Sequence, residues 1–343
     1  MKASNSASSG KTQQEEKSGS KWPAWHSDLL NYQKSSTWKA SWQLTNTLVP
    51  YGTLWLLMVL SIQRQYPYVV TLMLATAAAL FLVRLFILFH DCVHGSLFPK
   101  KGFNTFWGHA LGLLVFTPFE DWRFSHLRHH ATYANLDARG FGDIWTMTRA
   151  EYERASPTQR LSYRLYRNPL VLLGLGALFS FLLRYRLPTR KSKRKERMSV
   201  VFTNVLIVLV ILIATWTMGW RTYLLIQLPV LWLAGAMGIW LFYVQHQFEG
   251  GYWARKEDWA PMRAAMEGSS FFRLPTVLRW FSANIGYHHI HHLNSRIPNY
   301  RLKRCCDTIP PLRDKAALTI KKSFYSIHLK LWDEDRKELM GFP

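Results

Sequence analysis

Nine of the thirteen histidines stand in short, regularly spaced groups that are suited to binding metal ions. His90 and His94 are four residues apart, and His246 stands alone. Two H-x-x-H-H boxes contain the others, namely His126, His129 and His130, and His288, His291 and His292. On a helix, residues at i, i+3 and i+4 share one face, so each box directs its imidazoles toward one place. Imidazole binds iron, zinc, copper and nickel, and nine imidazoles exceed the needs of one ion.

The types of the ligands narrow the choice of metal. Nine neutral nitrogens suit two ions with four or five ligands each, which leaves a position for dioxygen or water. The sequence contains no H-E-x-x-H motif of a zinc protease, and no box contains the glutamate ligands of soluble di-iron bundles. We therefore predict two iron ions, because a redox metal is what makes use of such a site beside lipid.

Four apolar runs are long enough to cross a bilayer with a hydrocarbon core of about 30 Å. We predict spans at residues 42–62, 69–89, 200–220 and 223–244. Short links within each pair make two transmembrane hairpins. His90 follows the second span directly and His246 follows the fourth, so the spans deliver these histidines to one membrane face.

Two weaker apolar stretches, 106–119 and 168–183, lie between the second and third spans. A strongly basic block at 184–197 follows them, and the positive-inside rule assigns that block to the cytosol. If 168–183 crossed the membrane alone, the basic block and the second box would face opposite sides. We therefore interpret both stretches as interfacial or re-entrant. Both termini and all nine histidines then face the cytosol, at the plasma membrane.

The predicted fold is an all-α integral membrane protein with four transmembrane helices, interfacial helices and a cytosolic helical cap that holds the histidines. We expect residues 1–40 to form a polar, partly disordered cytosolic N-terminus and residues 41–343 to form one domain. Its cytosolic segments are 90–199 and 245–343. The net charge of +22 flanks apolar segments, which favours an anionic membrane surface or an acidic partner over nucleic acid.

Seven carboxylates near the boxes either orient ligating imidazoles or pair with the abundant Arg and Lys. They are Asp91, Glu120, Asp121, Asp137, Asp143, Glu249 and Asp258. Asp91 follows His90 directly, so it faces away from the ligand side of its helix.

The boxes and their flanking strings form a recognisable set. They read HDCVH (90–94), HLRHH (126–130) and HHIHH (288–292), with GDIWT (142–146), QHQFE (245–249) and NIGYHHIHHLNSRIPNY (284–300) around them. This set resembles the membrane fatty acid desaturases, and specifically the bacterial acyl-lipid desaturases related to the phospholipid delta-5 type. The resemblance covers nearly the whole chain after about residue 35.

The resemblance implies a di-iron centre held by the nine box histidines, with Asn284 positioning a water ligand. It implies a cis double bond introduced into a membrane phospholipid acyl chain, at delta-5 or else at delta-12/omega-6. Dioxygen would be the co-substrate, since an unactivated methylene C–H is far too weak an acid for any side chain. Electrons would come from a ferredoxin- or flavodoxin-like protein, whose acidic surface suits the positive charge of this chain. His289 lies off the ligand pattern, in a supporting position.

The resemblance also raises the question of a tunnel for the acyl chain. Five aromatic residues near the ligands either line this tunnel or simply pack: Trp145, Trp240, Tyr243, Phe248 and Phe272. Gly235 and Gly238 mark places where helices approach closely or where an acyl chain lies. His26, His109 and His328 are expected at the surface or the membrane interface.

Two other functions stay open. A membrane hydroxylase, alkane monooxygenase or carotenoid ketolase would use similar boxes but would insert oxygen into its product. A metal-binding scaffold or transporter would lack redox chemistry, but transporters place polar groups in mid-membrane. In this sequence Arg84 is the single charged residue within the four predicted spans.

Overall fold

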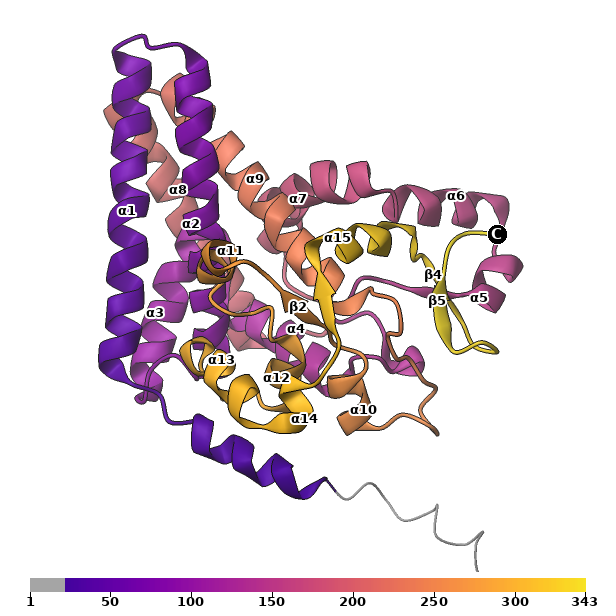
Figure 1. Cartoon of the computed structure of the whole chain (residues 1–343). Coiled ribbons are helices and arrows are strands. Elements are labelled where there is room, and N and C mark those ends of the chain that lie inside the picture. Colours follow the sequence, from indigo (N-terminus) through magenta and orange to yellow (C-terminus); the bar gives the residue numbers. More distant parts are fainter. Residues whose placement is uncertain (1–21) are drawn as a thin grey trace, which may run out of the picture.

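The computed structural model describes residues 22–343, and this part of the chain is mostly helical (Figure 1). Within it, four helices are long and apolar enough to cross a membrane: α1 (Thr37–Gln63), α2 (Tyr68–His94), α8 (Arg194–Met218) and α9 (Trp220–His246). Each overlaps one predicted span, so the prediction of four apolar membrane helices is confirmed. Helix α8 ends at Met218, two residues before the end of the predicted span 200–220. It ends there because Gly219 adopts a left-handed φ of 84° at the link to α9.

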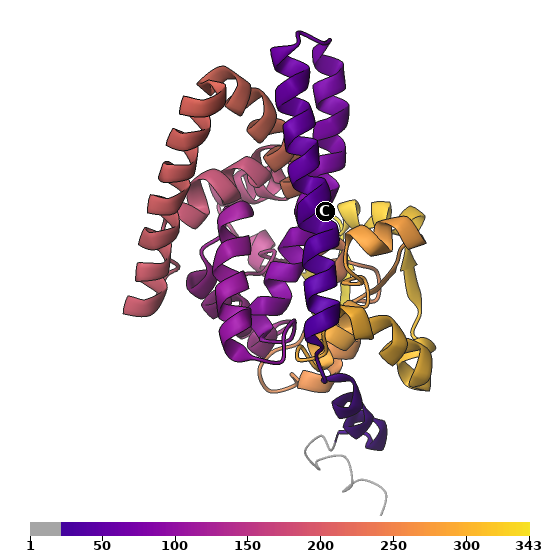
Figure 2. The same ribbon diagram turned by 90° about the vertical axis from the view of Figure 1, so that its left-hand side faces the viewer.

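The two pairs of long helices, α1 with α2 and α8 with α9, are arranged differently. Helices α1 and α2 lie side by side, and the small residues Ala75, Ala78 and Ala79 of α2 are fully buried among the packed helices. Figure 2 shows α8 and α9 diverging from the turn that joins them. Other segments of the chain fill the space beside α9. They form the walls of the cavity that is described below.

The two weaker apolar stretches form α3 (Lys101–Leu114) and a broken helix. The broken helix consists of α6 (Pro157–Tyr166), η3 (Val171–Leu175), α7 (Gly176–Leu178), η4 (Phe179–Leu183) and η5 (Arg184–Arg186). Its two halves are bent by 64° at Arg167–Pro169, where the proline cannot continue the hydrogen-bond ladder of α6. By length and composition alone the pair would count as a broken fifth span. Figure 1 shows α6 and α7 lying across the direction of α1 and α2, as an interfacial segment would.

The polar part of the chain consists of short elements. Its other helices are η1 (Ala24–Tyr32), α4 (Phe119–Thr132), η2 (Leu136–Ala138), α5 (Arg149–Arg154), α10 (Pro261–Met266), α11 (Thr276–Phe281), α12 (His288–Leu293), α13 (Asn299–Thr308), α14 (Pro310–Arg313), α15 (Ile320–Ser323) and η6 (Phe324–His328). Strand β4 (Leu331–Asp333) pairs in parallel with β1 (Met147–Thr148) and antiparallel with β5 (Glu338–Met340). Strand β2 (Phe271–Arg273) pairs in parallel with β3 (Ala317–Thr319). We predicted a helical cap and did not predict these strands. Two or three residues are too few to show the alternating pattern of a strand.

Part of the predicted N-terminal segment lies within the described residues. Residues 1–21 lie outside the described residues. From Ala24 the chain forms η1, whose Leu29 is fully buried and packs in the cluster that contains Leu302 of α13. Residues 24–32 are therefore attached to the polar part of the protein.

Candidate metal centre

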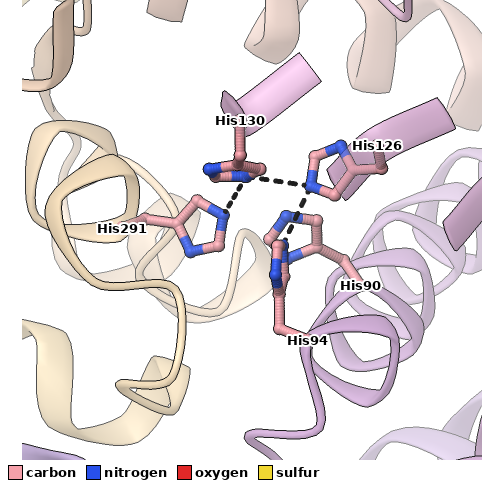
Figure 3. A group of neighbouring side chains, drawn as sticks. All are labelled: His90, His94, His126, His130 and His291. Carbon is pink, nitrogen blue, oxygen red and sulfur yellow. Dashed lines mark hydrogen bonds between the residues drawn. The ribbon is translucent and has the colours of Figure 1, made fainter. Parts of the chain in front are cut away.

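The nine box histidines lie together where α2, α4, α9 and α12 meet. In the first group each histidine offers one ring nitrogen, and these nitrogens lie within 4.8 Å of one another; the group consists of His90, His94, His126, His130 and His291 (Figure 3). The second group does the same with His129, His246 and His292. His288 adjoins the second group, because its Nε2 lies 3.1 Å from Nε2 of both His246 and His292.

Each H-x-x-H-H box is divided between the two groups in the same way. In α4, the i and i+4 residues His126 and His130 belong to the first group, and the i+3 residue His129 belongs to the second. In α12, His288 and His292 belong to the second group, and His291 belongs to the first. At 3.6 residues per turn, position i+4 is rotated by about 40° from i, whereas i+3 is rotated by about 60° the other way. One helix can therefore serve two adjacent sites.

The spacing of the nitrogens fits bound metal ions. Neighbouring Nε2 atoms are 3.0 Å apart for His94 and His126, 3.2 Å for His126 and His130, and 3.0 Å for His130 and His291. Two ligands at right angles, each about 2.1 Å from a metal, would be about 3 Å apart. Among the described residues, the buried Nε2 of His129 has no hydrogen-bond partner, so its lone pair is available to an ion.

Burial also sets the protonation state that metal binding needs. It lowers the pKa of each box histidine of α12, and of His126 and His130 in α4, well below the usual value. Neighbouring imidazoles lower the pKa further, since two adjacent rings cannot both hold an extra proton cheaply. Neutral rings offer a lone pair, so the donor set fits two ions with nitrogen ligands.

Asp143 is the carboxylate that orients a box histidine. Its Oδ1 accepts a hydrogen bond of 2.6 Å from Nδ1 of His129, and its Oδ2 accepts one from the backbone N–H of Gly140. This contact leaves Nε2 of His129 directed at the second group. Asp143 is one of the seven carboxylates considered from the sequence.

Removing this carboxylate should weaken metal binding without changing the fold. We expect Asp143→Ala to lower metal affinity and product formation by about 10- to 100-fold, as is usual for a partner that orients a ligating histidine. Iron content of the purified protein and lipid composition of expressing cells measure the effect. Asp137→Ala is the matched control, because Asp137 pairs with Arg255 away from the histidines. Equal iron retention in the two variants would contradict the role of Asp143.

Other carboxylates near the boxes have different partners. Glu120 forms an ion pair with Lys195 at 2.8 Å, as Asp137 does with Arg255. For these two carboxylates, the predicted alternative of pairing with a basic side chain is confirmed. Asp121 accepts hydrogen bonds from Thr189 and thereby holds the loop before α8 against α4. Asp91 belongs to neither histidine group, as predicted, but its Oδ1 lies 3.6 Å from Nδ1 of His90. Its Oδ2 accepts two hydrogen bonds of 2.8 Å from Asn299 and so joins α13 to α2.

Two further residues were predicted to support the ligands, namely Asn284 and His289. Nδ2 of Asn284 donates to the backbone carbonyl of Asn299 at 3.0 Å, so its amide oxygen is the atom left for a water ligand. This role stays a prediction. His289 is fully buried outside both groups, its ring 5.7 Å from that of Phe271, and burial lowers its pKa to about 3.

Aromatic residues that contact the histidines, among them Trp122 and Tyr133, were missed by the sequence interpretation. Trp122 stacks on His126 with ring centroids 4.3 Å apart and an interplanar angle of 16°. The ring of Tyr133 lies 4.2 Å from that of His246, and its hydroxyl donates to the carbonyl oxygens of His246 and Gly268. Trp122 stands four residues before His126 and Tyr133 four residues after His129, so i±4 spacing from a ligand was the available signal.

A cavity of about 700 Å³ leads from the histidines toward the far ends of α2 and α9. Its apolar walls come from α2, α9 and the broken helix, and His90, His126 and His288 line its inner end. None of the five aromatic tunnel candidates lines it. The lining reaches Leu231, fifteen residues before His246, which corresponds to about 22 Å along a helix. One leaflet of a bilayer core is about 15 Å thick, so the cavity is long enough for one acyl chain.

The fold and the site together define a membrane protein with an imidazole-rich centre suited to two metal ions and a long apolar cavity that ends on it. The sequence model of the fatty acid desaturase family matches residues 65–323. A "Fatty acid desaturase" of Bacillus subtilis (strain 168) is 44% identical over 88% of this chain and 85% of its own length. The chain therefore belongs to the fatty acid desaturase family, and it is a desaturase oxidoreductase of lipid metabolism.

More distant relatives are similar over a smaller share of the chain. The "sn-1 acyl-lipid omega-3 desaturase (ferredoxin)" of a Synechocystis strain is 27% identical over 66% of this chain and 64% of its own length. The chloroplastic "Omega-3 fatty acid desaturase" of Brassica napus is 27% identical over 67% of this chain and 58% of its own length. These matches support the same family.

Proposed function

We propose that this protein introduces a cis double bond into an acyl chain of a membrane phospholipid at a di-iron centre held by the nine box histidines. The observation that carries the proposal is the apolar cavity whose inner end is lined by His90, His126 and His288. A cavity of this length would hold an extended chain with one pair of methylenes beside the histidines. Arg184 also lines the cavity and offers a cation to a phosphate group.

The residues around the cavity would do the positioning. Leu82, Phe86, Ile239 and Phe242 line it and would hold the chain and exclude water. When bound, two iron ions would supply the redox chemistry by which dioxygen, two electrons and two protons take two hydrogen atoms from the acyl chain and leave two water molecules. Asp143 would keep His129 in the tautomer that presents Nε2 to the metal.

The charge distribution supports an orientation in the membrane and a class of partner. The basic block at 184–197 supports a location in the plasma membrane with the histidines and both termini on the cytosolic side. The segments 90–199 and 245–343 would then also face the cytosol. Electrons would come from a ferredoxin- or flavodoxin-like protein, and the "(ferredoxin)" in the names of the cyanobacterial relatives supports this donor class. The flanking strings QHQFE and NIGYHHIHHL support delta-5 as the bond position, with delta-12/omega-6 as the alternative.

Product analysis tests the proposal. We expect cells that express the chain to accumulate a monounsaturated acyl chain in their phospholipids, and the purified protein to contain about two iron ions per chain. Gas chromatography–mass spectrometry of fatty acid derivatives measures the bond position, and elemental analysis measures the iron. A hydroxylated or keto product would contradict desaturation and favour the monooxygenase or ketolase alternative.

A further inference from the structure

Two short helices outside the four spans carry exposed apolar side chains. In α11, Val277 is 66% exposed, and Leu278 and Trp280 are also exposed. In η6, Phe324 and Tyr325 are more than half exposed. The two helices have six and five residues, so neither can cross a bilayer. Clustered exposed apolar groups of this kind need a partner.

Helix α11 lies beside the apolar part of α2. The ring of Phe81 packs edge-on against Trp280 and Phe281, with centroids 5.9 Å and 5.1 Å apart. Phe81 is nine residues before His90, which is about 13 Å along the helix, well inside the apolar run 69–89. The exposed face of α11 is therefore at a depth where lipid surrounds α2.

Arg84 explains why α11 occupies this depth. This charged residue of the second span is buried, and its Nη1 donates to the backbone carbonyl of Trp280. Its guanidinium carbon lies 4.0 Å from the centroid of the Trp280 ring, and its Nε donates to Thr47 of α1. A guanidinium exposed to hydrocarbon costs several kcal/mol, so α11 stabilises the span by covering it.

The second helix, η6, lies beside α9. Phe324 contacts Trp240 with ring centroids 5.8 Å apart, and Trp240 is six residues, or about 9 Å, before His246. The broken helix contacts α9 deeper still, where Phe181 packs against Gly235. Figure 1 shows α11, α15 (which leads into η6) and α7 along the side of the polar part from which α1, α2 and α9 rise.

The charges around the two helices fit a membrane surface. Residues 270–284 and 315–330 contain no aspartate or glutamate. The basic residues beside the exposed apolar ones are Arg273, Arg279, Lys321 and Lys322. Aromatic side chains flanked by Lys and Arg are typical of membrane interfaces, where the cations meet anionic headgroups.

We propose that α11 and η6 are immersed in the membrane interface and bind the lipid bilayer. Their exposed apolar side chains lie among the acyl chains, and the flanking cations contact anionic lipid headgroups. The proposal requires that α2 and α9 cross a membrane, and it is independent of the reaction that the protein catalyses. At the depth of Phe81 and Trp240, the bilayer is what surrounds these two spans.

Single-site fluorescence in the full chain tests this placement. Val277→Cys and Tyr325→Cys are labelled with a polarity-sensitive fluorophore and placed in nanodiscs of phosphatidylcholine and phosphatidylglycerol. The three native cysteines are buried, so labelling is selective for the introduced residue. We expect a blue-shifted emission at both sites, loss of emission with acyl-brominated lipids, and little loss with aqueous iodide.

Two matched sites calibrate the result. Leu212→Cys on the exposed face of α8 gives the response of a lipid-facing residue, and Glu257→Cys gives that of an exposed residue in the polar part. Retained lipid composition in expressing cells shows that each variant folds. Quenching by iodide as at Glu257 would overturn the proposal. Protection from both quenchers would also overturn it, because a protein would then cover the surface in place of lipid.

Discussion

Replacing His291 by alanine is expected to remove the metal from the first histidine group and to lower desaturation by about 1,000-fold or more. A metal ion supplies several kcal/mol of transition-state stabilisation, and each 1.4 kcal/mol corresponds to a factor of ten in rate. His292→Ala, one residue further along α12, is expected to have the same effect through the second group. Iron per chain and the unsaturated fraction of cellular phospholipids are the two measurements.

The pair of variants separates the two sites. Each should lose iron from one group, so both should fall from about two ions per chain toward one. His328→Ala is the control, because His328 is exposed on η6 and belongs to neither group. Unchanged unsaturation in both His291→Ala and His292→Ala would contradict catalysis at these histidines and favour a metal-binding scaffold.

The convergence of the boxes could be predicted because span ends fix the membrane face to which each box belongs. Hydropathy predicted the spans, and the basic block favoured a topology in which residues 168–183 do not cross the membrane alone. The division of each box between two groups was not predicted, since i, i+3 and i+4 were treated as a single face. The 100° between His129 and His130 on α4 was present in the spacing and would have shown it.

Contacts between distant parts of the chain could not be predicted in the same way. Asp143 was one of seven carboxylates considered. It contacts His129 because the loop that carries it returns to α4, fourteen residues after His129. Arg84 and Trp280 are 196 residues apart, so nothing local shows that α11 covers the charge. The paired strands are too short for a pattern in the sequence. Such features depend on tertiary packing, which overrides local propensity.

The two glycines of α9 both line the cavity but have different neighbours, although both were predicted to have the same two possible roles. A Cβ added to Gly235 would lie 3.0 Å from the Cβ of Ala177 and 3.2 Å from the ring of Phe181. Gly235 therefore allows the broken helix to approach α9 closely, and it also lines the cavity. A Cβ added to Gly238 would meet nothing within 4 Å, and Gly238 lines the cavity. A larger side chain there would take up cavity volume without displacing backbone.

Gly238→Leu is therefore expected to shorten the acyl chain that the cavity accepts. Gly238 is eight residues, or about 12 Å, from His246, so the added side chain would block the cavity away from the histidines. Desaturation of the longest chains should fall by about 10- to 200-fold for each methylene that no longer fits, while shorter chains stay substrates. Gas chromatography–mass spectrometry of cellular phospholipids measures the product ratio by chain length. Gly52→Leu is the matched control, since Gly52 of α1 also has open space but lies outside the cavity. If both variants gave the parent product ratio, the cavity would not be the acyl-chain site, because a blocked tunnel must change which chains reach the histidines.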